Sequence, residues 1–228
     1  MVKMTRRGLM RQTAAIVGAM ICRGFGRERV AAGISEMRPS LGQAKSGSRG
    51  ARFLDVHHHV LPPQYVNEVG GSAIGAPAGR ENEPPWTVGS SIEVMDSLGI
   101  ETAITSVSAP GLPLSDPKAV QRLTRTCNDF SKRMMADHPR RFGMFATLPL
   151  PDMDASLAEV RHAFEELSAD GIVLYTNYHD VYLGRALFSP LMEELNRRKA
   201  VVFVHPTVCQ CSLGLQPEIP RAILEFPP

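Results

Sequence analysis

Short apolar runs alternate with longer amphipathic stretches along the 228-residue chain, and no other feature constrains the fold as much. Each run is rich in β-branched or aromatic residues and stays apolar at successive positions, which is typical of strands buried on both faces. In the stretches between them, apolar residues recur at helical spacing. Asp116-Pro117 is a typical helix start and Gly99 a typical helix end. The predicted strands are 53–56, 102–107, 142–146, 171–175 and 200–204, and the predicted helices are 91–98, 116–138, 154–168 and 190–198.

Strict alternation of strands and helices predicts a parallel sheet with right-handed crossovers, which places the chain in the α/β class. A closed (β/α)8 barrel has eight strand–helix units, whereas this sequence supplies about five. The predicted fold is therefore a partial TIM (β/α)8 barrel. An open sheet of this kind would leave two strand edges and part of a core face uncovered, so association with another chain, as in a homo-oligomer, is expected.

The formal net charge of +2 conceals an uneven distribution along the chain. The first 50 residues contain ten Lys and Arg and only two acidic residues, Glu28 and Glu36, so the remainder has an acidic excess. That remainder shows no stripe of basic residues with interleaved aromatic residues. A nucleic acid is therefore not expected as a partner.

The N-terminal segment resembles a twin-arginine export signal, because Arg6 and Arg7 precede a short apolar stretch at 13–22. A membrane-spanning helix needs roughly 20 apolar residues, so no stable membrane anchor is expected. The pattern favours export to the periplasm; the alternative is a basic tail on a cytoplasmic protein. The predicted organisation is a signal segment at 1–32, a linker at 33–51 and an incomplete barrel domain at 52–228.

Three consecutive histidines, His57, His58 and His59, follow the first predicted strand. Successive side chains on a strand point to opposite faces, so His57 and His59 share one face while His58 points away. Two imidazoles at this spacing can bind one divalent ion. His205 follows the fifth predicted strand, and ligands of parallel α/β folds gather at the carboxyl ends of the strands. Taken alone, His205 is equally well interpreted as a hydrogen-bonded core histidine. With the first motif, the predicted metal ligands are His57, His59 and His205.

Three polar residues at or just after strand ends are candidates for binding a substrate: Ser106, Tyr175 and Asn177. Residues in these positions line the pockets of α/β folds, although capping of a loop explains them equally well.

Five segments carry a family resemblance in their order and spacing: DVHHHVLPP at 55–63, MDSLGI at 95–100, RFGMFATLP at 141–149, ADGI at 169–172 and VFVHP at 202–206. Together they resemble the amidohydrolase-related (amidohydrolase 2) family, and within it the group of aminocarboxymuconate-semialdehyde and 6-methylsalicylate decarboxylases. The resemblance implies a (β/α)8 barrel with a single metal ion, usually Zn²⁺, bound by His57, His59 and His205. The family also uses a proton-handling histidine and a metal-binding aspartate from later strands. Both would lie beyond Pro228, so the sequence is expected to be C-terminally truncated, and its catalytic residue is not assigned.

The function implied by the resemblance is that of a metal-dependent carboxy-lyase, which removes CO2 from an aromatic or conjugated unsaturated carboxylic acid. The metal ion would hold the carboxylate of this small-molecule substrate while a protonated group delivers a proton to the carbon that bears it. Two alternatives stay open. One is metal-dependent hydrolysis of a lactone, amide or ester on the same barrel. The other is an inactive truncated fragment.

Overall fold

The computed structural model describes residues 52–70 and 86–209, which belong to one compact unit. The predicted signal segment (1–32) and linker (33–51) lie outside the described residues, so both stay predictions. Within the part of the chain that is described, no helix combines the length and apolar character needed to cross a membrane.

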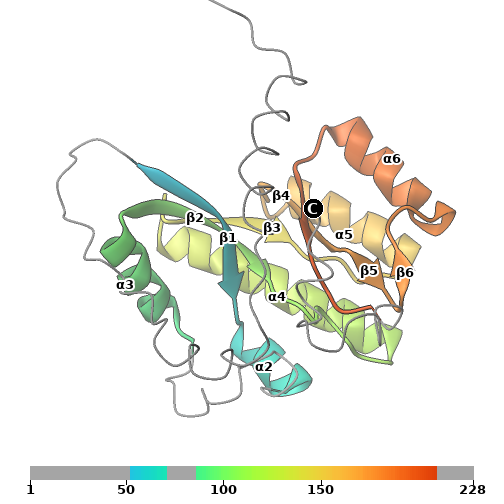
Figure 1. Cartoon of the computed structure of the whole chain (residues 1–228), viewed down its shortest axis with the longest axis horizontal. Coiled ribbons are helices and arrows are strands. Elements are labelled where there is room, and N and C mark those ends of the chain that lie inside the picture. The colour runs from blue at the N-terminus through green and yellow to red at the C-terminus, as the bar shows by residue number, and fades with distance from the viewer. Residues whose placement is uncertain (1–51, 71–85, 210–228) are drawn as a thin grey trace, which may run out of the picture. The chain divides into compact units, whose positions relative to one another are not determined.

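Five parallel strands form a sheet whose spatial order follows the order of the chain (Figure 1). Each connection between neighbouring strands contains at least one helix, so the sheet consists of successive β/α units. This arrangement confirms the predicted α/β class and the partial barrel. The strands are β1 (Phe53–Val60), β2 (Ile100–Val107), β3 (Phe142–Ala146), β4 (Gly171–Tyr175) and β7 (Val202–His205).

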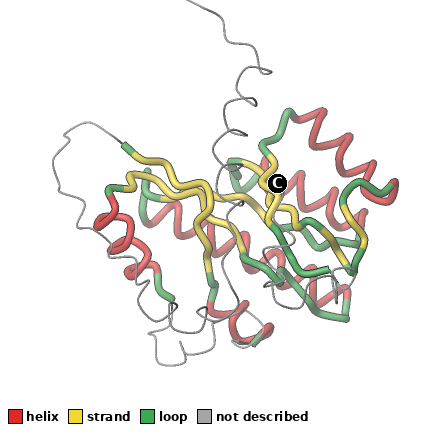
Figure 2. The backbone as a smooth tube through the Cα atoms, viewed as in Figure 1, coloured by secondary structure: helices red, strands yellow, loops and turns green. Residues whose placement is uncertain are grey.

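The helices flank the strands, as Figure 2 shows in red beside the yellow sheet. All four predicted helices are present. The helix-start prediction is confirmed, because the Asp116 carboxylate accepts hydrogen bonds from the backbone N–H groups of Lys118 and Ala119. Gly99 ends its helix with a φ of 72°, in the left-handed region that glycine adopts without strain. The helices are α2 (Pro63–Val69), α3 (Val88–Leu98), α4 (Pro117–Asp137), α5 (Met153–Glu165) and α6 (Ser189–Arg198).

Some elements differ from the sequence-based expectation. β1 extends to Val60 and includes the three histidines, whereas the prediction ended that strand at position 56. Helix α2 was not predicted, nor were the hairpin of β5 (Asn177–Tyr178) and β6 (Val181–Tyr182) and the 3₁₀ turn η1 (Ala186–Phe188). All four are short, and short elements leave too few residues for a periodic pattern.

The central strands β3 and β4 are buried at every position, so both faces of the sheet are covered there. On the outer face, Met144 of β3 and Ile172 of β4 pack in one cluster with Val160 of α5 and Leu191 of α6. Side chains on the other face of the strands form a second, inner cluster of Ile104, Phe145, Val173 and Phe203. The rings of Phe145 and Phe203 stack there with their centroids 5.6 Å apart. His205 lies two residues beyond Phe203 and therefore shares the inner face.

The sheet has two edge strands, β1 and β7. Leu54 and Val56 on β1 and Val202 and Val204 on β7 are exposed apolar side chains. They fit the expected uncovered face of an open sheet.

Candidate metal centre

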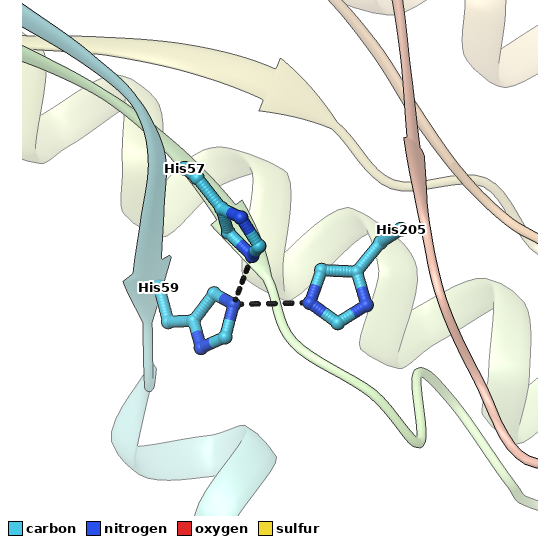
Figure 3. A group of neighbouring side chains, drawn as sticks. All are labelled: His57, His59 and His205. Atoms are coloured by element: carbon cyan, nitrogen blue, oxygen red, sulfur yellow. Dashed lines mark hydrogen bonds between the residues drawn. The ribbon is translucent and has the colours of Figure 1, made fainter. Parts of the chain in front are cut away.

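The inner face brings the three predicted ligands together although they come from the two edge strands of the sheet. Figure 3 shows His57 and His59 on β1 with their rings turned toward His205 on β7. One ligating nitrogen from each side chain can be chosen so that all three lie within 4.8 Å of one another. Among the described residues this is the group of histidine, cysteine and carboxylate side chains suited to holding an ion.

The ring nitrogens approach one another closely. The Nε2 atom of His59 lies 3.1 Å from Nε2 of His57 and 3.1 Å from Nε2 of His205. The ring centroids of His57 and His205 are 5.0 Å apart, and the rings meet edge to face. Three imidazole nitrogens this close together could bind one divalent ion, and zinc sites use histidine ligands of this kind.

The ring of His205 is fixed by its own backbone neighbour. Its Nδ1 donates a hydrogen bond to the carbonyl oxygen of Pro206 at 2.7 Å, which leaves the lone pair on Nε2 free to bind an ion. His205 itself is 7% exposed, whereas His57 and His59 are open to solvent. A buried ligand from one strand thus faces two accessible ligands from the other.

The surroundings of His59 and His205 favour the neutral form of both imidazoles. Although His59 is exposed overall, its ring loses part of its solvation beside the other histidines, and this loss, together with the neighbouring rings of His205 and His57, lowers the pKa of His59 to about 4. Burial lowers the pKa of His205 as well, although its hydrogen bond to Pro206 opposes that shift. Neutral imidazole is the form that binds a metal, so the donor chemistry fits a divalent ion near pH 7.

A β-bulge shapes the strand that carries His57 and His59. Between the pairs Asp55–Ala103 and His58–Thr105, β1 contains one residue more than β2. Oδ1 of Asp55 accepts a hydrogen bond from the backbone N–H of His57 at 2.9 Å. Partial burial opposes ionisation of Asp55, but its hydrogen bonds from His57 and His58 outweigh this and hold its pKa below the usual value of 3.8.

Two of the three substrate-binding candidates line a cavity of about 450 Å³ that His205 also lines. Tyr175 and Asn177 contribute to its wall together with His205. The Tyr175 hydroxyl donates to the carbonyl oxygen of Val107 at 2.9 Å, and burial raises the pKa of this phenol well above its usual value. The Asn177 amide donates to the carbonyl oxygen of Thr207 at 3.2 Å.

Ser106, the third candidate, is not among the residues that line this cavity. It pairs with His59 across β1 and β2, is 1% exposed, and its hydroxyl finds no hydrogen-bond partner among the described residues. Sequence reasoning missed Tyr178, whose ring also lines the cavity. It also missed Asp55, although an acidic residue directly before a histidine motif is a usable signal for a partner of that motif.

Comparison with known proteins gives evidence on the family of this chain that is independent of the geometry of the site. The family model described as amidohydrolase matches residues 54–227. A decarboxylase of Aspergillus niger is 44% identical over 185 residues, covering 76% of this chain and 50% of that protein. A 6-methylsalicylic acid decarboxylase of Aspergillus aculeatus is 39% identical over 178 residues, covering 76% of this chain and 53% of that protein.

A similar fold occurs in the crystal structure of 5-carboxyvanillate decarboxylase from Novosphingobium aromaticivorans, which contains manganese and 4-hydroxy-3-methoxy-5-nitrobenzoic acid. The two chains superpose with a TM-score of 0.65 at 22% identity, over 72% of this chain and 53% of that one. The present chain spans about half the length of the curated relatives it matches. The family match covers β1 and β7 and every histidine of the cluster, and it shows that the chain belongs to the amidohydrolase family.

Proposed function

We propose that the chain carries the metal-binding part of a carboxy-lyase that decarboxylates an aromatic or conjugated unsaturated carboxylic acid. The observation that carries this proposal is the convergence of His57, His59 and His205, the last of which lines a cavity of about 450 Å³. The relatives named as decarboxylases support the reaction type.

Zn²⁺ is the ion that we propose for the site. Three imidazole ligands suit zinc, which takes nitrogen ligands in tetrahedral sites and keeps a position open when it is catalytic. A divalent ion held here would supply positive charge that binds a carboxylate and stabilises negative charge during the reaction. Manganese, which is present in the 5-carboxyvanillate decarboxylase structure, is the competing ion that the experiment must include.

The walls of the cavity fit a flat, largely apolar acid. Pro110, Leu148, Tyr175 and Tyr178 present apolar and aromatic surface that would bind the substrate's ring and exclude water. Asn177 is the polar group that we propose to orient the substrate, since its side chain is 5% exposed and lies on the same wall. Contact of Ser106 with a substrate stays a prediction from the sequence and is not part of this proposal, because its side chain is 1% exposed and does not line the cavity.

An assay of product type tests the reaction. The purified chain is loaded with Zn²⁺ or Mn²⁺ and incubated with 6-methylsalicylate and with muconate-type acids, and release of CO2 is measured. Metal-dependent CO2 release would support the carboxy-lyase. Ring opening of a lactone or cleavage of an amide or ester without CO2 release would favour the hydrolase instead. Stoichiometric metal binding with neither reaction would favour the inactive fragment, and CO2 release without any metal would refute the proposed site.

Two further expectations from the sequence stay proposals with their own tests. Fusion of residues 1–51 to a reporter that is active only after folding in the cytoplasm and export would test the twin-arginine interpretation.

Sedimentation of the chain over a range of concentrations would test association through the exposed apolar residues of β1 and β7, which include Leu54 and Val204. A monomer at all concentrations would refute the homo-oligomer.

A further inference from the structure

The middle histidine of the motif, His58, takes part in a separate hydrogen-bonded network on the opposite side of β1. Its Nδ1 lies 3.0 Å from Oδ2 of Asp55, and its Nε2 lies 2.5 Å from the hydroxyl oxygen of Ser91 on helix α3. These hydrogen bonds therefore connect strand β1 to helix α3, although His58 and Ser91 are 33 positions apart in the sequence.

The donors and acceptors of this hydrogen-bonded network can be paired with His58 carrying a proton on one ring nitrogen. The Asp55 carboxylate accepts from the His58 Nδ1–H, which leaves Nε2 to accept from the Ser91 hydroxyl. The second carboxylate oxygen of Asp55 accepts from the backbone N–H of His57 at 2.9 Å. A continuous path of hydrogen bonds thus runs from α3 to the backbone of a predicted metal ligand.

The path of hydrogen bonds is buried away from solvent where it reaches helix α3. Ser91 is 4% exposed, and Met95, one helical turn further along the same face of α3, is fully buried. The side chain of His58 is 13% exposed and that of Asp55 is 28% exposed. Serine, histidine and aspartate in this order also occur in hydrolytic triads, but a hydroxyl buried this deeply is not accessible to an acyl substrate.

The path acts at the bulge of β1. The extra residue of β1 lies between Asp55 and His58, and it breaks the strict alternation of side chains along the strand. Across this irregular segment, the Asp55 carboxylate accepts one hydrogen bond from the backbone N–H of His57 and one from the ring of His58. Losing them would allow the strand to relax toward regular pairing, which would turn His57 relative to His59.

We propose that Asp55, His58 and Ser91 are positioning residues of the metal centre. They fix the bulge of β1 and so hold the Nε2 atoms of His57 and His59 at their separation of 3.1 Å, from which both could bind one ion. This inference rests on the proposed metal site, and it assigns to helix α3 a part in shaping that site.

Co²⁺ binding by the full chain tests the proposal, because the visible absorption of Co²⁺ reports on the geometry of its ligands. Ser91→Ala removes the helix end of the path, and Asp55→Asn replaces an acceptor of the His58 proton with a donor. Outer hydrogen-bond partners of metal ligands typically contribute about 10- to 100-fold to affinity. We expect Asp55→Asn to weaken Co²⁺ binding within this range, Ser91→Ala to weaken it toward the lower end, and both to shift the absorption bands.

Two matched variants separate positioning from general damage. Ser97→Ala makes the same substitution on the same helix, where the hydroxyl donates to the carbonyl oxygen of Val94 within the helix, so Co²⁺ affinity and spectrum should equal those of the unmodified chain. Ser91→Thr keeps the hydroxyl and should restore both. If Asp55→Asn does not fold, the comparison of the Ser91 and Ser97 variants still decides the question.

A measurement without metal distinguishes failure of this inference from failure of the proposed function. In the metal-free chain, ¹⁵N correlation spectra of the imidazoles should show shifted signals for His57 and His59 in Ser91→Ala and unchanged signals in Ser97→Ala. An unmodified chain that does not bind Co²⁺ would refute the proposed metal site, while the imidazole signals would still report on positioning. Unchanged Co²⁺ affinity, absorption and imidazole signals in Ser91→Ala would overturn the inference.

Discussion

The Nε2 atoms of His59 and His205 lie 3.1 Å apart, although the two residues are 146 positions apart and sit on the two edge strands of the sheet. Only a strongly curled sheet can bring the inner faces of its two outermost strands into contact. The geometry of the site is thus a direct consequence of barrel-like curvature, and it is already present with five strands.

Removal of one histidine of the cluster should abolish tight metal binding. His205→Ala deletes the buried ligand, and loss of a ligand exceeds the effect of an outer partner, so we expect affinity for Zn²⁺ to fall by more than about 100-fold in a competition titration with a chelator. His138→Ala is the control. His138 lies at the C-terminal end of α4, where its ring contacts Phe142 and not the three clustered histidines. Equal affinities of the two variants would contradict the assignment of His205.

The metal-free chain should lose stability in mild acid. The pKa of His59 is about 4 in the folded chain, below the ordinary value of 6.5. Between these two values the unfolded chain binds more protons than the folded chain, so protons favour unfolding as the pH falls from about 6.5 to about 4, with no further loss from this residue below that range. The urea midpoint should therefore decrease over this interval. His59→Asn cannot titrate and should show a smaller decrease; an identical decrease would refute this origin.

The sequence predicted the strands best where both faces are buried. The bounds of β3 and β4 agree with the predicted runs at 142–146 and 171–175, because each run is apolar throughout and ends at polar or turn residues. β1 was predicted too short because three imidazoles resemble a polar loop, whereas here they face a helix on one side and the interior on the other.

The same contrast holds at the site. His57, His59 and His205 could be predicted because alternation along a strand and position at a strand end are visible in the sequence. Ser91 could not, since nothing in a helical pattern marks which of its serines reaches a strand 33 residues earlier. The bulge that links Asp55 to His58 depends on pairing with β2, which strand periodicity alone does not reveal.

A buried polar network between α4 and α5 should contribute measurably to stability. Glu159 is 4% exposed and accepts hydrogen bonds from Arg125 at 2.7 Å and from the Asn128 amide at 2.8 Å. Asn128 also pairs with the backbone of Thr147 just beyond β3. Asn128→Ala would leave the carboxylate short of a donor and the Thr147 backbone unpaired, so we expect a loss of about 2–3 kcal/mol.

Urea denaturation of Asn128→Ala measures this loss. Glu166→Ala at the exposed end of α5 should change the free energy of unfolding by less than about 0.5 kcal/mol and serves as the control. A loss for Asn128→Ala as small as that of the control would show that water replaces the network.

Close packing of Gly111 against Tyr175 should make that glycine indispensable for the cavity wall. Gly111 has a φ of 74°, and an added Cβ would lie 2.6 Å from the Tyr175 ring. The ring cannot retreat readily, because it is buried and its hydroxyl is bonded to Val107. Gly111→Ala therefore combines backbone strain of roughly 1–2 kcal/mol with a steric clash. Gly184→Ala, where an added Cβ meets nothing within 4 Å, is the matched control. We expect the first substitution to lower the urea midpoint clearly and to weaken binding of an aromatic acid, and the second to change neither; equal effects would refute the tight contact.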